Sequence, residues 1–381
     1  MDSSIIPFNK PYLSGNETRY IEEAVQSGKI SGDGMFTKRC HQFFEQQLGF
    51  KKVLLTTSCT DALEMAALLL DIKPGDEVIM PSYTFVSTPN AFVLRGAHIV
   101  FADSTAENPN MDPAQVESLI TARTRAIVPV HYAGIACDMD PIMEIANNHK
   151  LFVVEDAAQA IDSYYKGRAL GTIGHLAAFS FHETKNIISG EGGMLAINDE
   201  RFAARAEIIR EKGTNRSSFF RGEVDKYGWV DQGSSFLPSD IIAAFLWAQL
   251  ENLRDIQAKR VAIWERYYSA LEPLVENGVE LPRLPNFATN NGHMFYMVCR
   301  SLAERTALIE SLKSQNINPV FHYLSLHTSP FYAEKHDGRV LPWADHYTDC
   351  LIRLPLYYEL STAQQNRITD AILAFYKQAA L

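Results

Sequence analysis

The chain has 381 residues, of which 46% are hydrophobic and 21% are charged, as in an ordinary soluble globular enzyme. This length can hold a large core and predicts two domains. The net charge of −10 argues against general attraction to nucleic acid, so an anionic substrate would need a local basic patch.

No stretch approaches the ~18 uninterrupted apolar residues that a membrane helix requires, so we expect no membrane insertion. The first residues lack the basic and apolar regions of a signal peptide. The five cysteines are scattered and odd in number, which argues against a disulfide framework or a metal site. We therefore expect a cytoplasmic protein without a metal.

Residues 17–27 and 36–48 have helical spacing, and hydroxyl side chains precede the next helix. Thr56, Thr57, Ser58 and Thr60 stand before a strongly helical run that begins at Asp61. Hydroxyls and free N–H groups at a helix start can bind an anion such as a phosphate. An ordinary helix cap needs the same residues, so the pattern alone leaves both interpretations open.

Strand and helix signals alternate after this helix. The strand candidates are residues 78–80, 99–101, 126–130, 151–154 and 177–181. Helical candidates at residues 88–95, 113–121 and 141–149 lie between them. This alternation predicts an α/β layer with a mainly parallel sheet. No nucleotide P-loop or complete dinucleotide fingerprint is present.

Two charged residues follow buried strands in this region. Asp156 ends an apolar run at the carboxyl end of a predicted parallel strand, where such sheets bind ligands. Lys185 lies four residues after Phe181 and before the turn Gly190-Glu191-Gly192-Gly193. A helix-capping acid and a surface lysine are the ordinary alternatives. A partly buried lysine is instead suited to Schiff-base chemistry, because burial lowers its pKa.

The acid and the lysine together match the needs of pyridoxal phosphate (PLP). The lysine binds the cofactor aldehyde, and the carboxylate keeps the pyridine nitrogen protonated so that the ring can accept electrons. The hydroxyl-rich helix start then becomes the predicted phosphate site. The chain order Ser58, Asp156, Lys185 favours this interpretation over three unrelated structural roles.

The second half of the chain begins with a helix at residues 202–211 and a long polar stretch at 212–233. This stretch carries Arg216, Arg221 and Lys226 among aromatic residues. Such a loop is commonly only solvated, but long loops inside compact domains are more often functional. Basic and aromatic groups suit a diphosphate and a pyrimidine ring.

The remaining residues predict a smaller α+β unit. Residues 240–271 read as one long helix or a helix pair. A strand at 295–300, a helix at 303–315, an extended segment at 320–324 and a final helix at 362–377 follow. We expect a large domain over residues 1–250 and a small domain over residues 251–381.

Several motifs resemble those of the DegT/DnrJ/EryC1/StrS family of sugar aminotransferases. They are TSCTDAL, GDEVIMPSYTFVST, FVVEDAAQ, SFHETKN with GEGG, and FHYLSLH, and the resemblance runs from about residue 7 to the end. It implies PLP-dependent transferase fold type I, which is aspartate aminotransferase-like. This fold has a large domain with a mainly parallel sheet and a small C-terminal α+β domain.

The resemblance also implies residue roles. Lys185 is catalytic, Asp156 pairs with the pyridine nitrogen, Gln159 contacts the ring hydroxyl side and Phe85 stacks on the ring. The phosphate is surrounded by Ser58, Cys59, Thr60, Asp61 and Ser180. Ser235 stands where the family often has an asparagine that reaches the partner subunit's phosphate, so this contact is open. The implied substrate-binding residues are His182, Arg216, Arg221, Lys226, His322, Tyr323 and His327.

Within the family, segments such as VPVHYAG and YKGRALGTIGH resemble enzymes that aminate C4 of a nucleotide-linked sugar. The implied reaction moves an amino group from glutamate to a dTDP-4-keto-6-deoxyhexose, with dTDP-4-keto-6-deoxy-D-glucose as first choice, for surface polysaccharide synthesis. The resemblance also implies a homodimer with shared active sites.

Three alternatives stay open. C3 amination of a 3-keto sugar uses the same cofactor machinery. Some family members are dehydratases with histidine as base, against which Lys185 argues. A PLP-binding regulatory protein that has kept the fold is the third.

Overall fold

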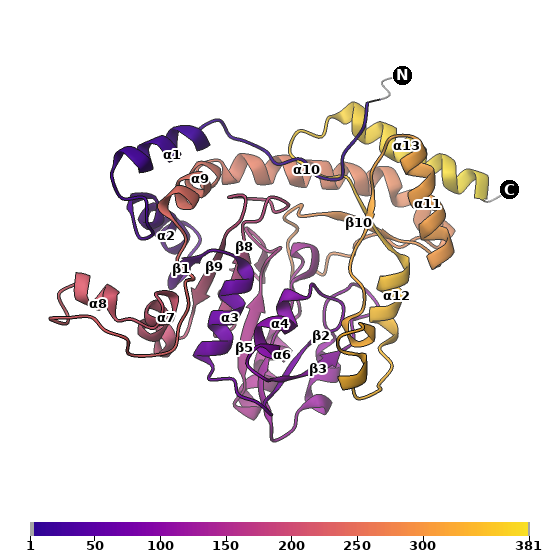
Figure 1. Ribbon diagram of the computed structural model, residues 1–381. Helices are drawn as coiled ribbons and strands as arrows, with labels where there is room; N and C mark the ends of the chain where they lie inside the picture. The colour runs from indigo at the N-terminus through magenta and orange to yellow at the C-terminus, as the bar shows by residue number, and fades with distance from the viewer. Residues whose placement is uncertain (1–3, 380–381) are drawn as a thin grey trace.

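The computed structural model describes residues 4–379, and its centre is a seven-stranded sheet (Figure 1). The strand order is β1-β9-β8-β5-β4-β2-β3, and β8, β5, β4, β2 and β3 run parallel to one another. Strand β9 is antiparallel to both of its neighbours. The strands are β1 (Lys52–Thr56), β2 (Glu77–Pro81), β3 (His98–Ala102), β4 (Thr124–Ile127), β5 (Phe152–Asp156), β8 (Leu176–Ser180) and β9 (Gly193–Ile197). The predicted α/β layer with a mainly parallel sheet is confirmed.

Both faces of the sheet are covered by helices. Successive residues of a strand point to opposite faces. In β2, Val78 and Met80 therefore join one apolar core while Ile79 joins the other. The first core includes α3 (Cys59–Leu69), α4 (Ser87–Val93) and α7 (Ala203–Arg210). The second includes α1 (Glu17–Gln26), α2 (Met35–Gln47), α6 (Met139–His149) and α9 (Asp240–Leu250). Burial on both faces explains the continuous apolar strands.

The predicted long helix is a pair. Helix α9 begins at the cap Ser239, whose hydroxyl accepts from the N–H of Ile242, and ends at Leu250. Helix α10 (Leu253–Leu271) follows after a short break. In Figure 1, α10 passes above the sheet toward the C-terminal helices. The break falls close to the predicted boundary after residue 250, but the division into two domains itself stays a prediction.

The C-terminal part contains a small antiparallel sheet of order β10-β12-β11. Its strands are β10 (Phe295–Val298), β12 (Leu351–Leu354) and β11 (Val320–Phe321). A third apolar core packs this sheet against α10, α11 (Leu302–Ser314) and α13 (Thr362–Ala379). Ile6 is buried in the same core and pairs with Ile317, so the N-terminal segment lies against the C-terminal part.

Shorter elements complete the described chain. They are α5 (Pro113–Val116), β6 (Tyr164–Tyr165), β7 (Arg168–Ala169), α8 (Arg216–Phe220), α12 (Pro342–Cys350) and the 3-10 turns η1 (Glu117–Leu119), η2 (Tyr132–Gly134), η3 (Glu200–Phe202), η4 (Glu272–Asn277), η5 (Leu326–Thr328) and η6 (Ala333–Lys335). Within residues 4–379, no helix combines the length and apolar character needed to cross a bilayer.

Three local expectations differ from the structure. Strand β1 was not predicted, because its apolar run merges with the hydroxyl-rich start of α3. The strand expected at residues 126–130 ends at Ile127, since Pro129 has no N–H for the ladder. The loop at residues 212–233 contains one short helix, α8.

Candidate active site

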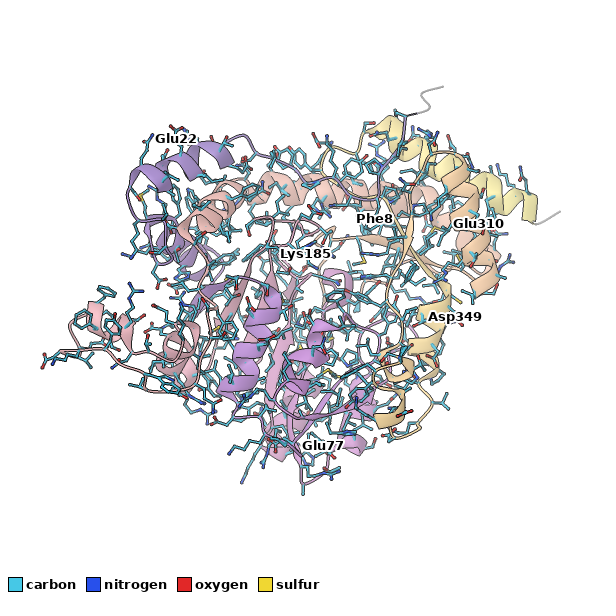
Figure 2. All side chains as sticks on the ribbon, in the orientation of Figure 1. Phe8, Glu22, Glu77, Lys185, Glu310 and Asp349 are labelled. Atoms are coloured by element: carbon cyan, nitrogen blue, oxygen red, sulfur yellow. The ribbon has the colours of Figure 1, made fainter. Side chains whose placement is uncertain are left out.

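A cavity of about 600 Å³ lies at the carboxyl ends of the parallel strands, between the large sheet and the small one. Its walls include the start of α3, the ends of β5 and β8, and strands β11 and β12. Lys185, Asp156 and Ser58 line it together. Figure 2 shows Lys185 above the ends of the strands and below α10. The three groups that the sequence suggested for PLP are therefore gathered in one space.

Lys185 lies in the turn that joins β8 to β9. Its N–H donates to the carbonyl of His182 at 2.9 Å, and the N–H of Glu183 donates to the carbonyl of Gly190 at 2.9 Å. Gly190 has a φ of 82°, a left-handed conformation that glycine adopts without strain. Burial lowers the pKa of Lys185, although the nearby Asp156 carboxylate opposes this shift. The neutral amine that nucleophilic chemistry needs is thus favoured.

The β8–β9 hairpin packs directly on the start of α3 at Gly193. A Cβ atom on Gly193 would come within 2.3 Å of the Ser58 carbonyl carbon and 2.4 Å of the Cys59 nitrogen. Only glycine permits this close approach of two backbones. The turn that carries Lys185 and the helix start that faces the cavity are therefore fixed relative to each other.

Asp156 is the last residue of β5, and its carboxylate is buried at the cavity wall. Thr88 donates its hydroxyl to one carboxylate oxygen at 2.7 Å, and the N–H of Ala158 donates to the other at 3.1 Å. Burial raises the pKa of Asp156, whereas these hydrogen bonds and the positive charge of Lys185 lower it. A buried carboxylate with no paired cation can stabilise a protonated pyridine nitrogen.

Glu155, the neighbouring acid, points to the other face of the sheet. Its carboxylate lies 2.9 Å from Nε2 of His131 and accepts from the N–H groups of Gly171, Ile173 and Gly174. These bonds satisfy it as a structural group. The alternation of the strand thus decides which of the two acids faces the cavity.

The start of α3 has the form of an anion site and of a helix cap at once. Ser58 is the N-cap, and its hydroxyl accepts from the N–H of Asp61 at 3.0 Å. The first helical turn leaves the N–H groups of Cys59 and Thr60 without intrahelical partners, and both residues line the cavity. These two groups and the helix dipole favour an anion here.

Asp61 does not line the cavity. Its carboxylate accepts a hydrogen bond from the hydroxyl of Thr57 instead. An ionised carboxylate would repel the phosphate. Any contact near Asp61 would therefore come from neighbouring groups of the helix turn and not from its side chain.

Three other predicted cofactor residues reach the cavity. Gln159 accepts from the N–H of Ala133 at 2.6 Å and donates to the hydroxyl of Tyr323 at 3.0 Å. Phe85 stands at the cavity lining, 55% exposed, with its ring 6.1 Å from that of Tyr323. Ser180 ends β8 and also lines the cavity.

Of the four predicted substrate-binding residues outside the long loop, three line the cavity and one does not. Nδ1 of His322 lies 2.8 Å from the Tyr132 hydroxyl, and burial lowers the pKa of His322 well below its usual range. His182 and Tyr323 line the same space. His327 is buried away from the lining, where its Nδ1 lies 2.8 Å from the Ser82 hydroxyl, so within one chain it has a structural position.

The predicted residues of the long loop lie elsewhere on this chain. Arg216 and Arg221 line a second cavity of about 520 Å³, where Arg221 pairs with Glu207 at 2.8 Å. Ser235 and Lys226 are exposed, and neither lines the cavity around Lys185. Figure 1 shows α8 at the left edge of the molecule. A single chain does not bring these residues to Lys185.

The cavity-lining residues that the sequence reasoning missed include Phe8, Thr88, His293 and Arg353. Thr88 could have been found, since a hydroxyl in PSYTFVSTPN follows a predicted parallel strand. The other three come from segments whose side-chain directions depend on how the small sheet packs, which no sequence pattern reveals.

The donor set fits a phosphorylated pyridine aldehyde. The free N–H groups at the start of α3 suit the phosphate, the low-pKa amine of Lys185 suits the aldehyde, and the Asp156 carboxylate suits the ring nitrogen. Each functional group of such a cofactor therefore has a matching residue.

The comparisons with known proteins agree with this geometry. The model of the DegT/DnrJ/EryC1/StrS aminotransferase family matches residues 11–373. The spore coat polysaccharide biosynthesis protein SpsC of Bacillus subtilis is 33% identical over 98% of both chains. The aminotransferase TlmJ from Streptoalloteichus hindustanus superposes with a TM-score of 0.91 at 28% identity, over 99% of this chain and 100% of that one.

Two further solved structures describe ligand states of similar proteins. The PLP-form of the sugar aminotransferase Spr1654 from Streptococcus pneumoniae has a TM-score of 0.90 at 26% identity, covering 98% and 99% of the two chains. S. venezuelae DesV, in complex with a ketimine intermediate, has a TM-score of 0.88 at 31% identity over 97% of both chains. On the family match and the SpsC identity, this chain belongs to the DegT/DnrJ/EryC1/StrS aminotransferase family.

Proposed function

We propose that this sugar aminotransferase moves an amino group from glutamate to C4 of a dTDP-4-keto-6-deoxyhexose, with dTDP-4-keto-6-deoxy-D-glucose as first choice. The observation that carries the aminotransferase chemistry is the meeting of Lys185, Asp156 and the start of α3 in one cavity. The cofactor is PLP. Neighbours in PLP and pyridoxamine phosphate (PMP) forms support a reaction in which the cofactor carries the amino group between two substrates.

The bound PLP supplies an electron sink for the carbon that loses a proton. The protein holds the cofactor phosphate through the N–H groups of Cys59 and Thr60, with the hydroxyls of Ser58 and Ser180 beside them. Asp156 keeps the ring nitrogen protonated, and its own orientation is fixed by Thr88 and Ala158.

Lys185 has two tasks in this proposal. Its Nζ would hold the cofactor aldehyde when no substrate is present, because its lowered pKa favours the nucleophilic amine. With an amino acid in its place, the freed Nζ would take the proton from Cα of the donor and pass it to the cofactor. In the return half it would move a proton from the cofactor to the sugar carbon. The kinetics should be ping-pong, with the keto acid released before the sugar binds.

The choice of sugar rests on resemblance. Segments of this sequence resemble dTDP-4-amino-4,6-dideoxygalactose transaminase, and the similarity to a spore coat polysaccharide protein supports a role in surface polysaccharide synthesis. His182, His322 and Tyr323 line the cavity beside Lys185, where they can contact the hexose. C3 amination of a 3-keto sugar would use the same residues with the ring turned.

A homodimer would complete this site. Arg216, Arg221, Lys226 and Ser235 do not reach the cavity of their own chain, and the loop that carries them exposes Phe220, Tyr227 and Trp229. We propose that the basic residues of this loop contact the nucleotide in the partner's site, and that Ser235 contacts the cofactor phosphate there. A fully active monomer at low concentration would contradict this part of the proposal.

The test is one incubation with glutamate and a panel of dTDP- and UDP-linked keto sugars, with the product identified by NMR. A C4 amine on a dTDP sugar is expected. Turnover only of a 3-keto or UDP sugar would overturn the substrate. A deoxygenated product, or PLP binding without any transamination, would overturn the reaction itself. Lys185→Ala should abolish turnover and the absorbance of the lysine-bound cofactor.

A further inference from the structure

Arg353 presents a buried guanidinium to the cavity without a hydrogen-bond acceptor. It lies on β12 of the small sheet and lines the cavity together with Lys185. Its Nε is buried and has no partner, and none of the residues between 4 and 379 forms a salt bridge with it. Burial lowers the pKa of Arg353, but a guanidinium keeps its proton. A buried cation of this kind needs an anion to balance it.

Aromatic rings surround Arg353. Its guanidinium carbon lies 4.7 Å from the centroid of the Phe8 ring. Burial raises the pKa of the nearby phenols of Tyr83, Tyr132 and Tyr323, so none of them supplies a negative charge. Two acids line the cavity. Asp156 is occupied by Thr88 and Ala158, and the exposed Glu191 lies 3.7 Å from His182. The anion for Arg353 must therefore come with a ligand.

The cofactor phosphate is not that anion. Its predicted site lies at the start of α3 on the large sheet, whereas Arg353 stands on the small sheet across the cavity. Beyond the effect of burial, the charge of Arg353 lowers the pKa of Lys185 and His322. The main causes of the pKa shifts of Cys59 and Asp156 are burial and other neighbours. The charge of Arg353 thus acts near the reacting amine rather than at the phosphate end.

Two candidate anions remain, the diphosphate of the nucleotide sugar and the α-carboxylate of the amino donor. They differ in how far they lie from the reacting atom of their own substrate. The diphosphate of a nucleotide sugar is attached to C1, across the hexose ring from C4. The α-carboxylate of an amino acid is attached to the same carbon as the reacting amine. A planar guanidinium near Lys185 matches the second anion, because its paired N–H groups fit both oxygens of one carboxylate.

We propose that Arg353, supported by the ring of Phe8, binds the α-carboxylate of the amino donor, an inference that rests on the proposed transfer from an amino acid. Phe8 acts as a positioning residue. It belongs to the N-terminal segment that pairs with Ile317, and its ring covers the guanidinium face. Figure 2 labels Phe8 close to the place where Figure 1 labels β10 of the small sheet.

The experiment compares the two half-reactions of the PLP-loaded enzyme. R353M removes the charge and keeps the length, R353K keeps the charge without the planar fork, and F8L removes the ring. R300Q is the matched control, since Arg300 is an exposed arginine of the same part of the chain that pairs with Glu304 at 2.6 Å. Stopped-flow absorbance follows the conversion of the PLP form to the PMP form by L-glutamate. The same conversion by an amino sugar without a carboxylate is the sugar half-reaction run in reverse.

R353M should lower kcat/KM for L-glutamate by about 10- to 100-fold, with R353K and F8L between it and wild type. In R353M the kcat/KM of the amino-sugar half-reaction should stay within about twofold of wild type. In R300Q the kcat/KM of both half-reactions should do the same. A binding measurement needs no turnover. Calorimetry with glutarate, a dicarboxylate without an amine, should show the same order of affinities, with R353M weakest and R353K and F8L between it and wild type. The amine 4-aminobutyrate lacks the α-carboxylate, so R353M and wild type should bind it with the same affinity.

Equal losses in both half-reactions of R353M, or unchanged glutarate affinity, would overturn the assignment. If the wild-type enzyme accepts no amino group from any amino acid yet binds glutarate through Arg353, the carboxylate site stands and the proposed reaction falls. The two failures are therefore distinguishable.

Discussion

Gly193→Ala should separate the lysine turn from the start of α3. The added Cβ would meet the Ser58 carbonyl carbon at 2.3 Å and the Cys59 nitrogen at 2.4 Å, both of them backbone atoms. Ordinary contact for such atoms begins near 3.4 Å, so the two backbones must move apart by about 1 Å. Overpacking of this kind costs roughly 1–3 kcal/mol of folding free energy.

The same movement should weaken cofactor binding. It displaces the N–H groups of Cys59 and Thr60, and a hydrogen bond to a charged group contributes ~1.5–3 kcal/mol. We therefore expect the dissociation constant for PLP to rise by about 10- to 100-fold. Absorbance titration of the apoprotein gives this constant, and thermal unfolding of the same samples gives the stability loss.

Gly228→Ala is the matched control. Gly228 has an ordinary φ, and a Cβ there meets nothing within 4 Å, so both quantities should stay near the wild-type values. Wild-type PLP affinity and melting temperature in Gly193→Ala would refute the close packing of the two segments. Equal losses in both variants would show that the effect belongs to glycine replacement in general.

Two pH dependences follow from buried groups. Covalent attachment of PLP to the apoprotein should rise with pH through the pKa of Lys185, at a midpoint below the ~10.4 of an ordinary lysine. Asp156→Asn should move that midpoint lower still, because the Asp156 charge raises the pKa of Lys185; a higher midpoint would contradict the geometry. Burial lowers the pKa of His41 to about 3, and its ring accepts from the N–H of Leu55. Since the unfolded chain protonates this histidine near pH 6.5, its contribution to stability is complete above that pH and decreases toward pH 3, by up to about 4 kcal/mol. Urea unfolding of wild type and His41→Gln between pH 4 and 8 checks this, and parallel curves for the two proteins would disprove it.

The sequence predicted the part of the site that lies on strand ends. Asp156 follows a continuous apolar run, and the carboxyl ends of parallel strands share one edge of the sheet. The resemblance then added roles for Gln159 and Tyr323, whose side chains do meet. Strand β1 escaped prediction because its apolar run merges with the hydroxyl-rich start of α3.

Other features depend on packing that a sequence pattern does not contain. Arg353 faces the cavity only because β12 lies between β10 and β11 in the small sheet. His327 belongs to the same motif as His322, yet it packs against Ser82. The roles of Arg216 and Arg221 depend on a second subunit and stay predictions.

The antiparallel strand β9 has a consequence for local opening. Because β9 pairs with β1 on one side and β8 on the other, both stems of the Lys185 turn are hydrogen-bonded inside the sheet. The turn cannot detach without breaking ladders at the centre of the protein, so its opening requires a free energy close to that of global unfolding. Amide hydrogens of β8 and β9 should therefore exchange among the slowest in the chain, while those of the exposed α8 loop exchange early. The turn that carries Lys185 is thus fixed when the chain folds, before any cofactor arrives.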